Sequence, residues 1–153
     1  WDQRYAKQLS RYHAIKKSPR ITHSEAEMLI AANKEIAHEI FDYKYANKPL
    51  SNTVTDKLLT IMKRIKPVDK TFYRGVEHEN YDDKHIMKVQ SWSVSPYTAK
   101  MFGDVIYKTI GPVVGIEIGE IYYWYGSLYG DDSGFGDSQA EWFLLNPKKE
   151  LVQ

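Results

Sequence analysis

The chain has 153 residues, of which 42% are hydrophobic, 27% charged and 14% aromatic, and its formal net charge is +1. This composition is typical of a globular domain and excludes an intrinsically disordered chain, which would hold fewer aromatic residues and a larger charge imbalance. The absence of cysteine excludes disulfide scaffolds, cysteine-based zinc sites and thiol catalysis. No apolar run approaches the ~18 residues of a membrane-spanning helix, so we expect no membrane partner.

The two halves of the chain differ in charge and in composition. Residues 1–70 hold 14 Lys and Arg against 8 Asp and Glu, whereas residues 71–153 hold 7 against 12. All nine glycines lie at Gly75 or later. A basic, glycine-free half followed by a glycine-rich half is typical of helices followed by strands. The sequence therefore predicts one α+β domain over 1–153, helical over 1–67 and β-rich over 70–153.

Three helices are predicted in the first half. Apolar residues at helical spacing predict the first helix over 2–17. Ser24 and Glu27 have the spacing of a capping box, and the apolar stripe after them predicts one continuous second helix. That stripe consists of Leu29, Ala32, Ile36 and Ile40. A third helix is predicted from near Ser51 to Pro67, and we expect all three apolar faces to pack in the core.

The second half is predicted to be mainly β-structure. Its short β-like runs are 71–74, 87–94, 105–110, 113–118, 121–125 and 140–145. A short helix is expected between Ser95 and Gly103, and a loop over 126–138, which contains four glycines and three aspartates. We expect the strands to form a two-sheet, mainly antiparallel core against which the N-terminal helices pack.

Common catalytic and metal-binding motifs do not occur in the sequence. It contains no glycine-rich dinucleotide motif, no P-loop and no G-x-S-x-G. Residues 38–42 approach the zincin helix motif, but Asp42 stands where the second histidine would be. The aspartates of the 126–138 loop lack the spacing of an EF-hand. We therefore expect no metal cofactor.

Three short segments stand out together, each on or beside a predicted strand. They are Phe72-Tyr73-Arg74-Gly75, Ser91-Trp92-Ser93-Val94-Ser95 and Gln139-Ala140-Glu141. As an ordered set over about residues 70–146, they resemble the Arg–Ser–Glu class of mono-ADP-ribosyltransferases, bacterial toxins and phage enzymes that transfer ADP-ribose from NAD to a target. Val94 replaces the usual threonine of the family's S-T-S strand.

The resemblance implies roles for several of these residues. Glu141 would be the catalytic carboxylate, Ser93 would orient Glu141 and the nicotinamide ribose, and Arg74 would bind the diphosphate of NAD. A fixed carboxylate stabilises an oxocarbenium-like ribose, and the cationic nicotinamide leaving group needs little acid catalysis. Gly75 and Ser95 would also bind NAD, the backbone of Gly75 by approaching the nicotinamide amide. The aromatic candidates for the nicotinamide pocket are Tyr73, Trp92 and Tyr107, although a core role is the default interpretation of each, and spacing does not choose among them.

Gln139 is the residue from which the resemblance implies the kind of acceptor that is modified. Arginine-modifying members of the family have a glutamate two residues before the catalytic one, whereas the amide of Gln139 suits a neutral acceptor through hydrogen bonding. This pattern is similar to that of the Rho-modifying clostridial exoenzymes, which modify asparagine, and of guanine-modifying relatives. Those exoenzymes place an aromatic residue three positions before the glutamine; here Gly136 has that position and Phe135 precedes it. Gln139 and Phe135 are the candidates for target recognition.

The resemblance thus implies a metal-free enzyme that uses NAD as its substrate and releases nicotinamide. We expect a monomeric toxin or effector, secreted or delivered, that acts in the cytoplasm of a target cell and is processed or cut from a longer polypeptide. A bacterial competition toxin would also have an immunity protein as a partner. A protein is the expected acceptor, and a nucleic acid is an alternative because the basic half could steer a polyanion. An NAD glycohydrolase and an inactive binding module are the remaining alternatives.

Overall fold

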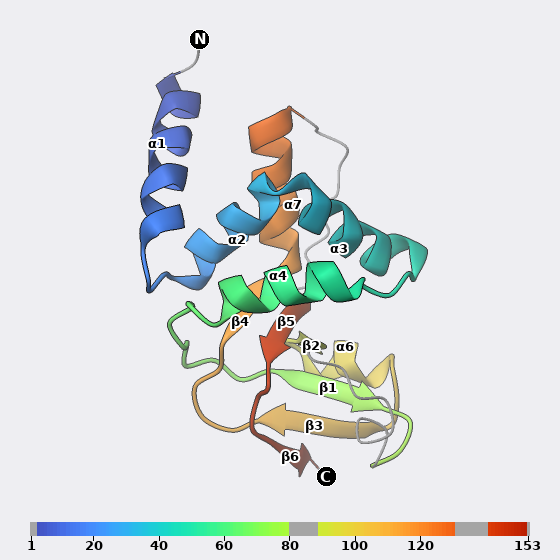
Figure 1. Cartoon of the computed structure of the whole chain (residues 1–153). Coiled ribbons are helices and arrows are strands. Elements are labelled where there is room, and N and C mark those ends of the chain that lie inside the picture. The colour runs from blue at the N-terminus through green and yellow to red at the C-terminus, as the bar shows by residue number, and fades with distance from the viewer. Residues whose placement is uncertain (1–2, 80–88, 131–140, 153) are drawn as a thin grey trace.

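The computed structural model describes residues 3–79, 89–130 and 141–152, which form a helical layer and a β-sheet (Figure 1). The helices in this part of the chain are α1 (Gln3–Lys17), α2 (His23–Ala32), α3 (Lys34–Ala46), α4 (Asn52–Met62), α6 (Pro96–Lys100) and α7 (Ile118–Tyr129). The strands are β1 (Tyr73–Val76), β2 (Val89–Ser93), β3 (Val105–Thr109), β4 (Gly115–Glu117), β5 (Glu141–Leu145) and β6 (Lys149–Val152). This combination of helices and an antiparallel sheet confirms the predicted α+β class. None of the described helices has the length and apolar character needed to cross a membrane.

Two of the three N-terminal helices form where the sequence predicts them. α1 matches the first predicted helix. α4 begins directly after Ser51, whose hydroxyl accepts a hydrogen bond from the N–H of Val54 at 3.1 Å. Such a cap satisfies one of the backbone donors that the first turn of a helix leaves without an intrahelical partner. α4 ends at Met62 rather than at Pro67, because the residues that follow pair with the segment after α1.

The predicted second helix is two helices, α2 and α3, which meet at Asn33. The side-chain oxygen of Asn33 accepts a hydrogen bond at 3.2 Å from an N–H in the first turn of α3. A short polar side chain that bonds to the backbone in this way competes with continuation of the helix before it. The capping box is formed by Thr22 and Glu25, so the prediction of Ser24 and Glu27 was wrong.

The predicted strand over 121–125 was also wrong, because these residues belong to α7, which extends through the first four residues of the predicted 126–138 loop. Aromatic and β-branched residues favour strands by propensity. Here, however, Ile118, Ile121 and Tyr122 are buried at helical spacing, and α7 packs against α2. Burial of this face against the helical layer overrides the local preference.

The described strands form one six-stranded sheet in the order β4-β5-β2-β1-β3-β6, with every neighbouring pair antiparallel. This corrects the predicted two-sheet core. The sheet is nevertheless narrow at its centre, because Tyr73 and Ser93 form the one register pair between β1 and β2, whereas β2 pairs with β5 over five positions. The edge strand β6 has no counterpart in the prediction. Its charged residues, including Glu150 in an ion pair with Lys108, give no apolar alternation and are typical of an exposed sheet edge.

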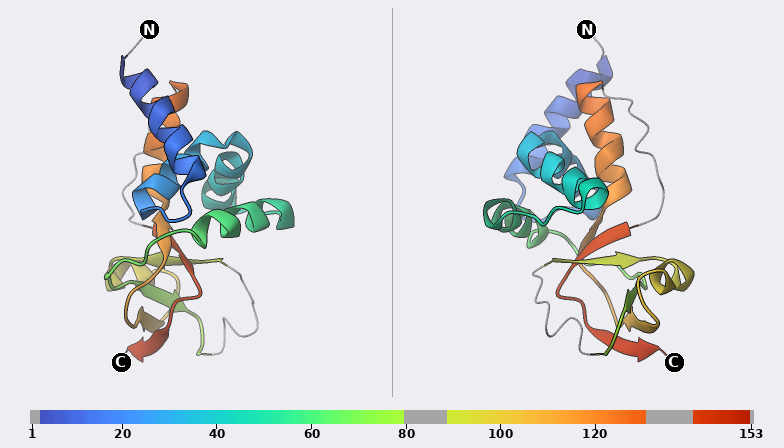
Figure 2. Two further views of the ribbon diagram at one scale, coloured as in Figure 1. Left: turned by 60° about the vertical axis from the view of Figure 1, so that its left-hand side comes forward. Right: turned by 90° about the vertical axis from the view of Figure 1, so that its right-hand side faces the viewer.

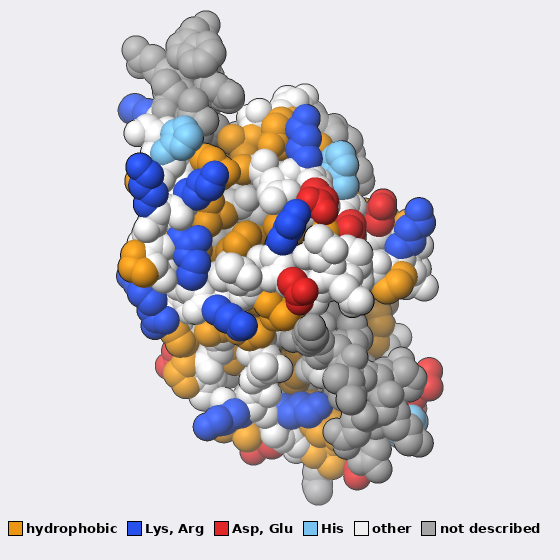
Figure 3. All heavy atoms as spheres, viewed as in Figure 1, with side chains coloured by type: hydrophobic (Ala, Val, Ile, Leu, Met, Phe, Trp, Pro, Cys, Tyr) orange, Lys and Arg blue, Asp and Glu red, His pale blue; other side chains and the backbone are white. Residues whose placement is uncertain are grey.

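Two apolar clusters lie on opposite faces of the sheet. The larger cluster joins the helices to one face and includes Phe143, whereas the smaller one on the other face contains Trp142 and Leu144. Neighbouring residues of β5 therefore point to different clusters, as the pleat of a strand requires. In both views of Figure 2, the N-terminal helices lie at one end of the molecule and β1, β3 and β6 at the other, next to the C-terminus. On the face drawn in Figure 3, Lys and Arg side chains gather over α1 and the helix ends below it.

A buried carboxylate connects α2 to the beginning of α7. The side chain of Glu27 is fully buried, and its Oε2 accepts hydrogen bonds from the N–H of Glu117 at 2.6 Å and from the ring of His23 at 3.3 Å. Burial raises the pKa of Glu27, and the hydrogen bond to Glu27 raises the pKa of His23. The contact places negative charge at the N-terminus of α7, where the helix dipole favours it.

Candidate active site

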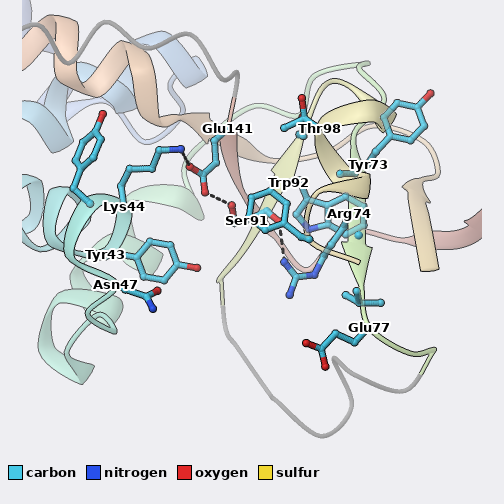
Figure 4. Close-up of a pocket in the computed structure, with 16 residues that line it drawn as sticks. Tyr43, Lys44, Asn47, Tyr73, Arg74, Glu77, Ser91, Trp92, Thr98 and Glu141 are labelled. Atoms are coloured by element: carbon cyan, nitrogen blue, oxygen red, sulfur yellow. Dashed lines mark hydrogen bonds and ion pairs between the residues drawn. The ribbon is translucent and has the colours of Figure 1, made fainter. Parts of the chain in front are cut away.

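Most of the predicted site residues that the structure describes line one cavity of about 540 Å³ (Figure 4), namely Tyr73, Arg74, Gly75, Trp92, Ser93 and Glu141. Its walls come from the C-terminal end of α3, from β1, β2 and α6, and from the first residue of β5. This volume is in the range of small-molecule sites, roughly 300–1,000 Å³. The cavity therefore has the size to hold a small-molecule ligand.

Glu141 is held from two sides at the wall of this cavity. The hydroxyl of Ser91 donates a hydrogen bond to Oε1, and the ammonium group of Lys44 donates one to Oε2 (Figure 4). The side chains of Lys44 and Glu141 are 17% and 18% exposed. A carboxylate that accepts two such bonds keeps a single orientation, and charge-assisted bonds are stronger than neutral ones. Glu141 is therefore a preorganised carboxylate at the edge of the cavity.

Ser91, rather than Ser93, provides the hydroxyl that bonds to Glu141. Ser93 is the register partner of Glu141, and Ser91 lies two residues away on the same face of β2, within diagonal reach of the carboxylate. The buried hydroxyl of Ser93 instead accepts a hydrogen bond from the N–H of Ser95 at 3.1 Å. Ser95 occupies the N-cap position of α6 and does not line the cavity. Sequence reasoning gave Ser91 no role, although the alternation of serines along β2 already placed it beside Ser93.

Arg74 contacts the same residue of β2. Its Nη1 donates a hydrogen bond to the backbone carbonyl of Ser91 at 2.9 Å, and its half-buried side chain lines the cavity. Ser91 thus joins the two predicted site residues, Arg74 through its carbonyl and Glu141 through its hydroxyl. Arg74 and Lys44 are the cations among the described lining residues, and Glu77 and Glu141 are the anions.

The end of α3 forms a wall that sequence reasoning missed. Tyr43, Lys44 and Asn47 line the cavity there, and the ring of Tyr43 packs edge-on against Phe143 with 5.4 Å between centroids. Asn47 ends the helix in the left-handed conformation, with φ 55°. In the sequence this segment resembles a solvated helix end. Only the folded chain places Lys44 against Glu141.

Gly75 allows α6 to pack directly on β1. A Cβ atom at Gly75 would lie 1.8 Å from the carbonyl oxygen of Ala99, and one at Gly103 would lie 2.2 Å from the carbonyl oxygen of Val76. Both glycines are therefore required by this close approach of two backbone segments. Gly75 also lines the cavity, so its predicted contact with the nicotinamide amide stays a prediction.

The three aromatic candidates have different surroundings. Tyr73 is half-buried and lines the cavity. Trp92 borders the cavity but is only 2% exposed and belongs to the smaller apolar cluster, which agrees with its default core role. Tyr107 packs against that cluster away from the cavity, and its hydroxyl donates to the carbonyl of Glu79 at 2.7 Å. Tyr73 is thus the aromatic candidate best placed to contact a ligand.

The predicted target-recognition residues, Gln139 and Phe135, lie outside the described residues. Their roles stay predictions. Within the described ranges, no group of three or more His, Asp and Glu side chains could hold a metal ion.

Comparisons with protein-family models, with curated proteins and with solved structures found no match for this chain. The residues of the cavity and the sequence resemblance are therefore the basis for a proposed function.

Proposed function

We propose that the protein is an NAD-dependent mono-ADP-ribosyltransferase. The observation that carries this proposal is that Arg74, Ser91 and Glu141, distant in the sequence, meet at one cavity where the carboxylate of Glu141 has a fixed orientation. A fixed carboxylate beside a cavity of this size suits a reaction in which positive charge develops on a bound sugar.

In the proposed reaction, the bond between C1′ of the ribose and the nicotinamide nitrogen breaks. Nicotinamide leaves as a neutral molecule with the electron pair of that bond, and the ribose gains oxocarbenium character. The carboxylate of Glu141 stabilises this charge and accepts a hydrogen bond from a ribose hydroxyl. A nucleophile of the acceptor then bonds to C1′ through its lone pair and transfers its proton to solvent. Ser91 and Lys44 already bond to the two oxygens of Glu141. The ribose hydroxyl therefore either shares one of these oxygens with Ser91 or Lys44, or displaces one of these two donors.

The diphosphate of NAD carries two negative charges, and the described cavity wall offers two cations, Lys44 and Arg74. The planar guanidinium of Arg74 matches a phosphate with parallel donors. In the proposed complex, Lys44 leaves Glu141 and bonds to the same diphosphate. This movement frees an oxygen of the carboxylate for the ribose. Binding of the diphosphate and release of the carboxylate are thereby coupled.

The sequence resemblance extends the proposal to the acceptor and to the setting. A neutral side chain of a host macromolecule is the proposed acceptor, because the amide of Gln139 replaces the second carboxylate of arginine-modifying enzymes. The protein would act as an effector in the cytoplasm of a target cell.

The proposal is tested by measuring nicotinamide release and the transfer of label from radioactive NAD to a host lysate. Glu141→Gln keeps the shape of the side chain but removes its charge, and we expect release to fall about 100-fold or more. Glu120→Gln is the matched control, since Glu120 is exposed on α7 and does not line the cavity. Label that stays on a macromolecule indicates a transferase, whereas soluble ADP-ribose alone indicates a glycohydrolase. If the unmutated protein releases no nicotinamide with or without lysate, and calorimetry detects no NAD binding, the proposal is wrong.

A further inference from the structure

A second surface carries charge of a single sign. Residues 3–21, which cover α1 and the turn after it, and residues 63–68, which follow α4, contain nine Lys and Arg and no Asp or Glu. We call the exposed cations of these two segments the basic surface. Its members are Lys7, Arg11, Lys16, Lys17, Arg20, Lys63 and Lys66. None of them lines the cavity.

The fold brings the two segments of the basic surface side by side. The N–H of Ile21 donates to the carbonyl of Arg64 at 3.0 Å, and the N–H of Lys66 donates to the carbonyl of Ile21 at 2.8 Å. The guanidinium of Arg64 also donates to the carbonyls of Ile15 at 2.6 Å and Ser18 at 3.0 Å, at the C-terminal end of α1. These four hydrogen bonds hold the two segments together, and the exposed cations belong to both of the joined segments. In Figure 3 this side of the molecule is lined with Lys and Arg side chains.

The charge of the basic surface is not neutralised within the described part of the chain. Other lysines form ion pairs there: Lys44 with Glu141, Lys57 with Glu35 and Lys108 with Glu150. No member of the basic surface forms an ion pair with a described acidic side chain. Since the whole chain carries +1, the residues outside these two segments carry −8. Such an uneven distribution creates a field that orients the protein toward a polyanion.

The extent of the surface favours a polymer over a small anion. α1 alone has 15 residues, and at ~1.5 Å per residue it extends over about 22 Å. A nucleic acid duplex presents one negative charge per ~1.7 Å of its axis, so several phosphates fit along this length. A single phosphate would contact only one or two of the seven side chains.

The surroundings of the surface favour a nucleic acid over a lipid bilayer. Helices that bind anionic membranes place large apolar side chains beside their cations. Among the described side chains, the exposed large hydrophobic ones lie elsewhere, the most exposed being Met101, Tyr97 and Phe102 in and after α6. None of the described ones lies on residues 10–17 of α1, on α4 or on the segments that follow these helices. Contact through charge alone is typical of proteins that bind the phosphate backbone.

We propose that the basic surface binds the phosphate backbone of a nucleic acid without reading its base sequence. This binding is separate from the proposed reaction of NAD, because the two sites share no residue. It would hold the enzyme near nucleic acid while the cavity stays accessible.

The test measures binding of fluorescently labelled duplex DNA and single-stranded RNA by anisotropy, from about 50 to 200 mM salt. The double variant Lys63→Glu/Lys66→Glu should weaken binding about tenfold or more and reduce the salt slope by ~1 for each lost phosphate contact. The matched control is Lys100→Glu/Lys148→Glu, which changes the net charge equally at exposed positions outside the basic surface. The change in net charge is the same in both double variants and by itself weakens binding only slightly. We therefore expect the control to bind within about twofold of the unmutated protein. Circular dichroism of both variants confirms that they are folded.

Three outcomes would overturn the proposal. The unmutated protein does not bind either nucleic acid at the lowest salt, or both double variants lose affinity equally, which indicates net charge alone. In the third outcome, vesicles containing phosphatidylserine bind more tightly than the nucleic acids and lose binding in Lys63→Glu/Lys66→Glu, which identifies a lipid surface. Each result is independent of nicotinamide release, so failure here leaves the proposed NAD chemistry standing.

Discussion

Lys44 and Glu141, which are 97 positions apart in the sequence, form an ion pair that joins the end of α3 to the beginning of β5. More than four fifths of each side chain is buried. This ion pair involves the carboxylate that we propose to act on NAD. Whether Lys44 is bonded to Glu141 therefore determines which carboxylate oxygens are available to a ligand.

Lys44→Met should lower the preference for NAD over nicotinamide riboside, which lacks the diphosphate, by about tenfold. A hydrogen bond to a charged group contributes about 1.5–3 kcal/mol, and about 1.4 kcal/mol corresponds to a factor of ten. Any effect of the substitution on the orientation of Glu141 applies to both substrates, so the ratio of their kcat/KM values isolates the diphosphate. Lys44→Arg keeps the cation and should keep the ratio. An unchanged ratio in Lys44→Met would show that Lys44 does not contact the diphosphate.

Ser91→Ala should lower kcat for nicotinamide release about 10- to 100-fold, because the carboxylate of Glu141 loses the hydroxyl that orients it. Ser93→Ala should have a smaller effect, since the hydroxyl of Ser93 bonds to the backbone of Ser95. Steady-state kinetics of the two variants, with their unfolding curves as a control for folding, decides between them. The opposite ranking would support the role that the sequence resemblance gives to Ser93.

Gly75→Ala should destabilise the protein by about 1–3 kcal/mol, the usual cost of overpacking. Its Cβ would lie 1.8 Å from a backbone oxygen of α6, so the helix must move. Gly111→Ala is the control: nothing lies within 4 Å of its Cβ, and only its φ of 73° is penalised, by about 1–2 kcal/mol. Urea unfolding measures both, and NAD binding should weaken only in Gly75→Ala. Unchanged stability and NAD binding in Gly75→Ala would contradict the packing argument.

The unfolding free energy should fall as the pH rises above about 6.5, the ordinary pKa of histidine. The hydrogen bond to Glu27 raises the pKa of His23 in the folded state, and burial raises that of Glu27. A raised folded-state pKa gives stability that is complete below the unfolded pKa and is lost as the pH rises through the folded one. Urea unfolding across this interval measures the loss. His23→Asn keeps a donor near Glu27 but does not titrate, so it should flatten the slope, and a steeper slope would contradict this assignment.

Local sequence signals predicted the elements whose apolar spacing and caps agree. α4 follows its serine cap, α6 begins at Pro96 directly after Ser95, and β3 coincides with a short run rich in β-branched residues. The failures have physical causes. α7 is rich in residues that favour strands, and only its contact with α2 makes it helical. The break at Asn33 depends on a side-chain cap that apolar spacing does not detect.

The site was predictable in part, for a similar reason. Arg74 and Glu141 could be singled out because they belong to short motifs on or beside predicted strands in a recognisable order, and both line the cavity. Lys44 could not be, because its role depends on how α3 packs across the sheet. The contact of Ser91 depends on a diagonal pairing between β2 and β5, and register of this kind is set by the whole sheet.

Because the sheet is narrow at its centre, Arg74 also has a structural role there. Because Tyr73 and Ser93 are the one register pair between β1 and β2, the strands separate beyond it, and the sheet forks beside the cavity. In an unbroken antiparallel ladder, a backbone N–H of β1 would donate to the carbonyl of Ser91. The guanidinium of Arg74 donates to that carbonyl instead. The side chain that we propose to bind the diphosphate therefore also spans the fork and completes the hydrogen bonding of the strand beside it.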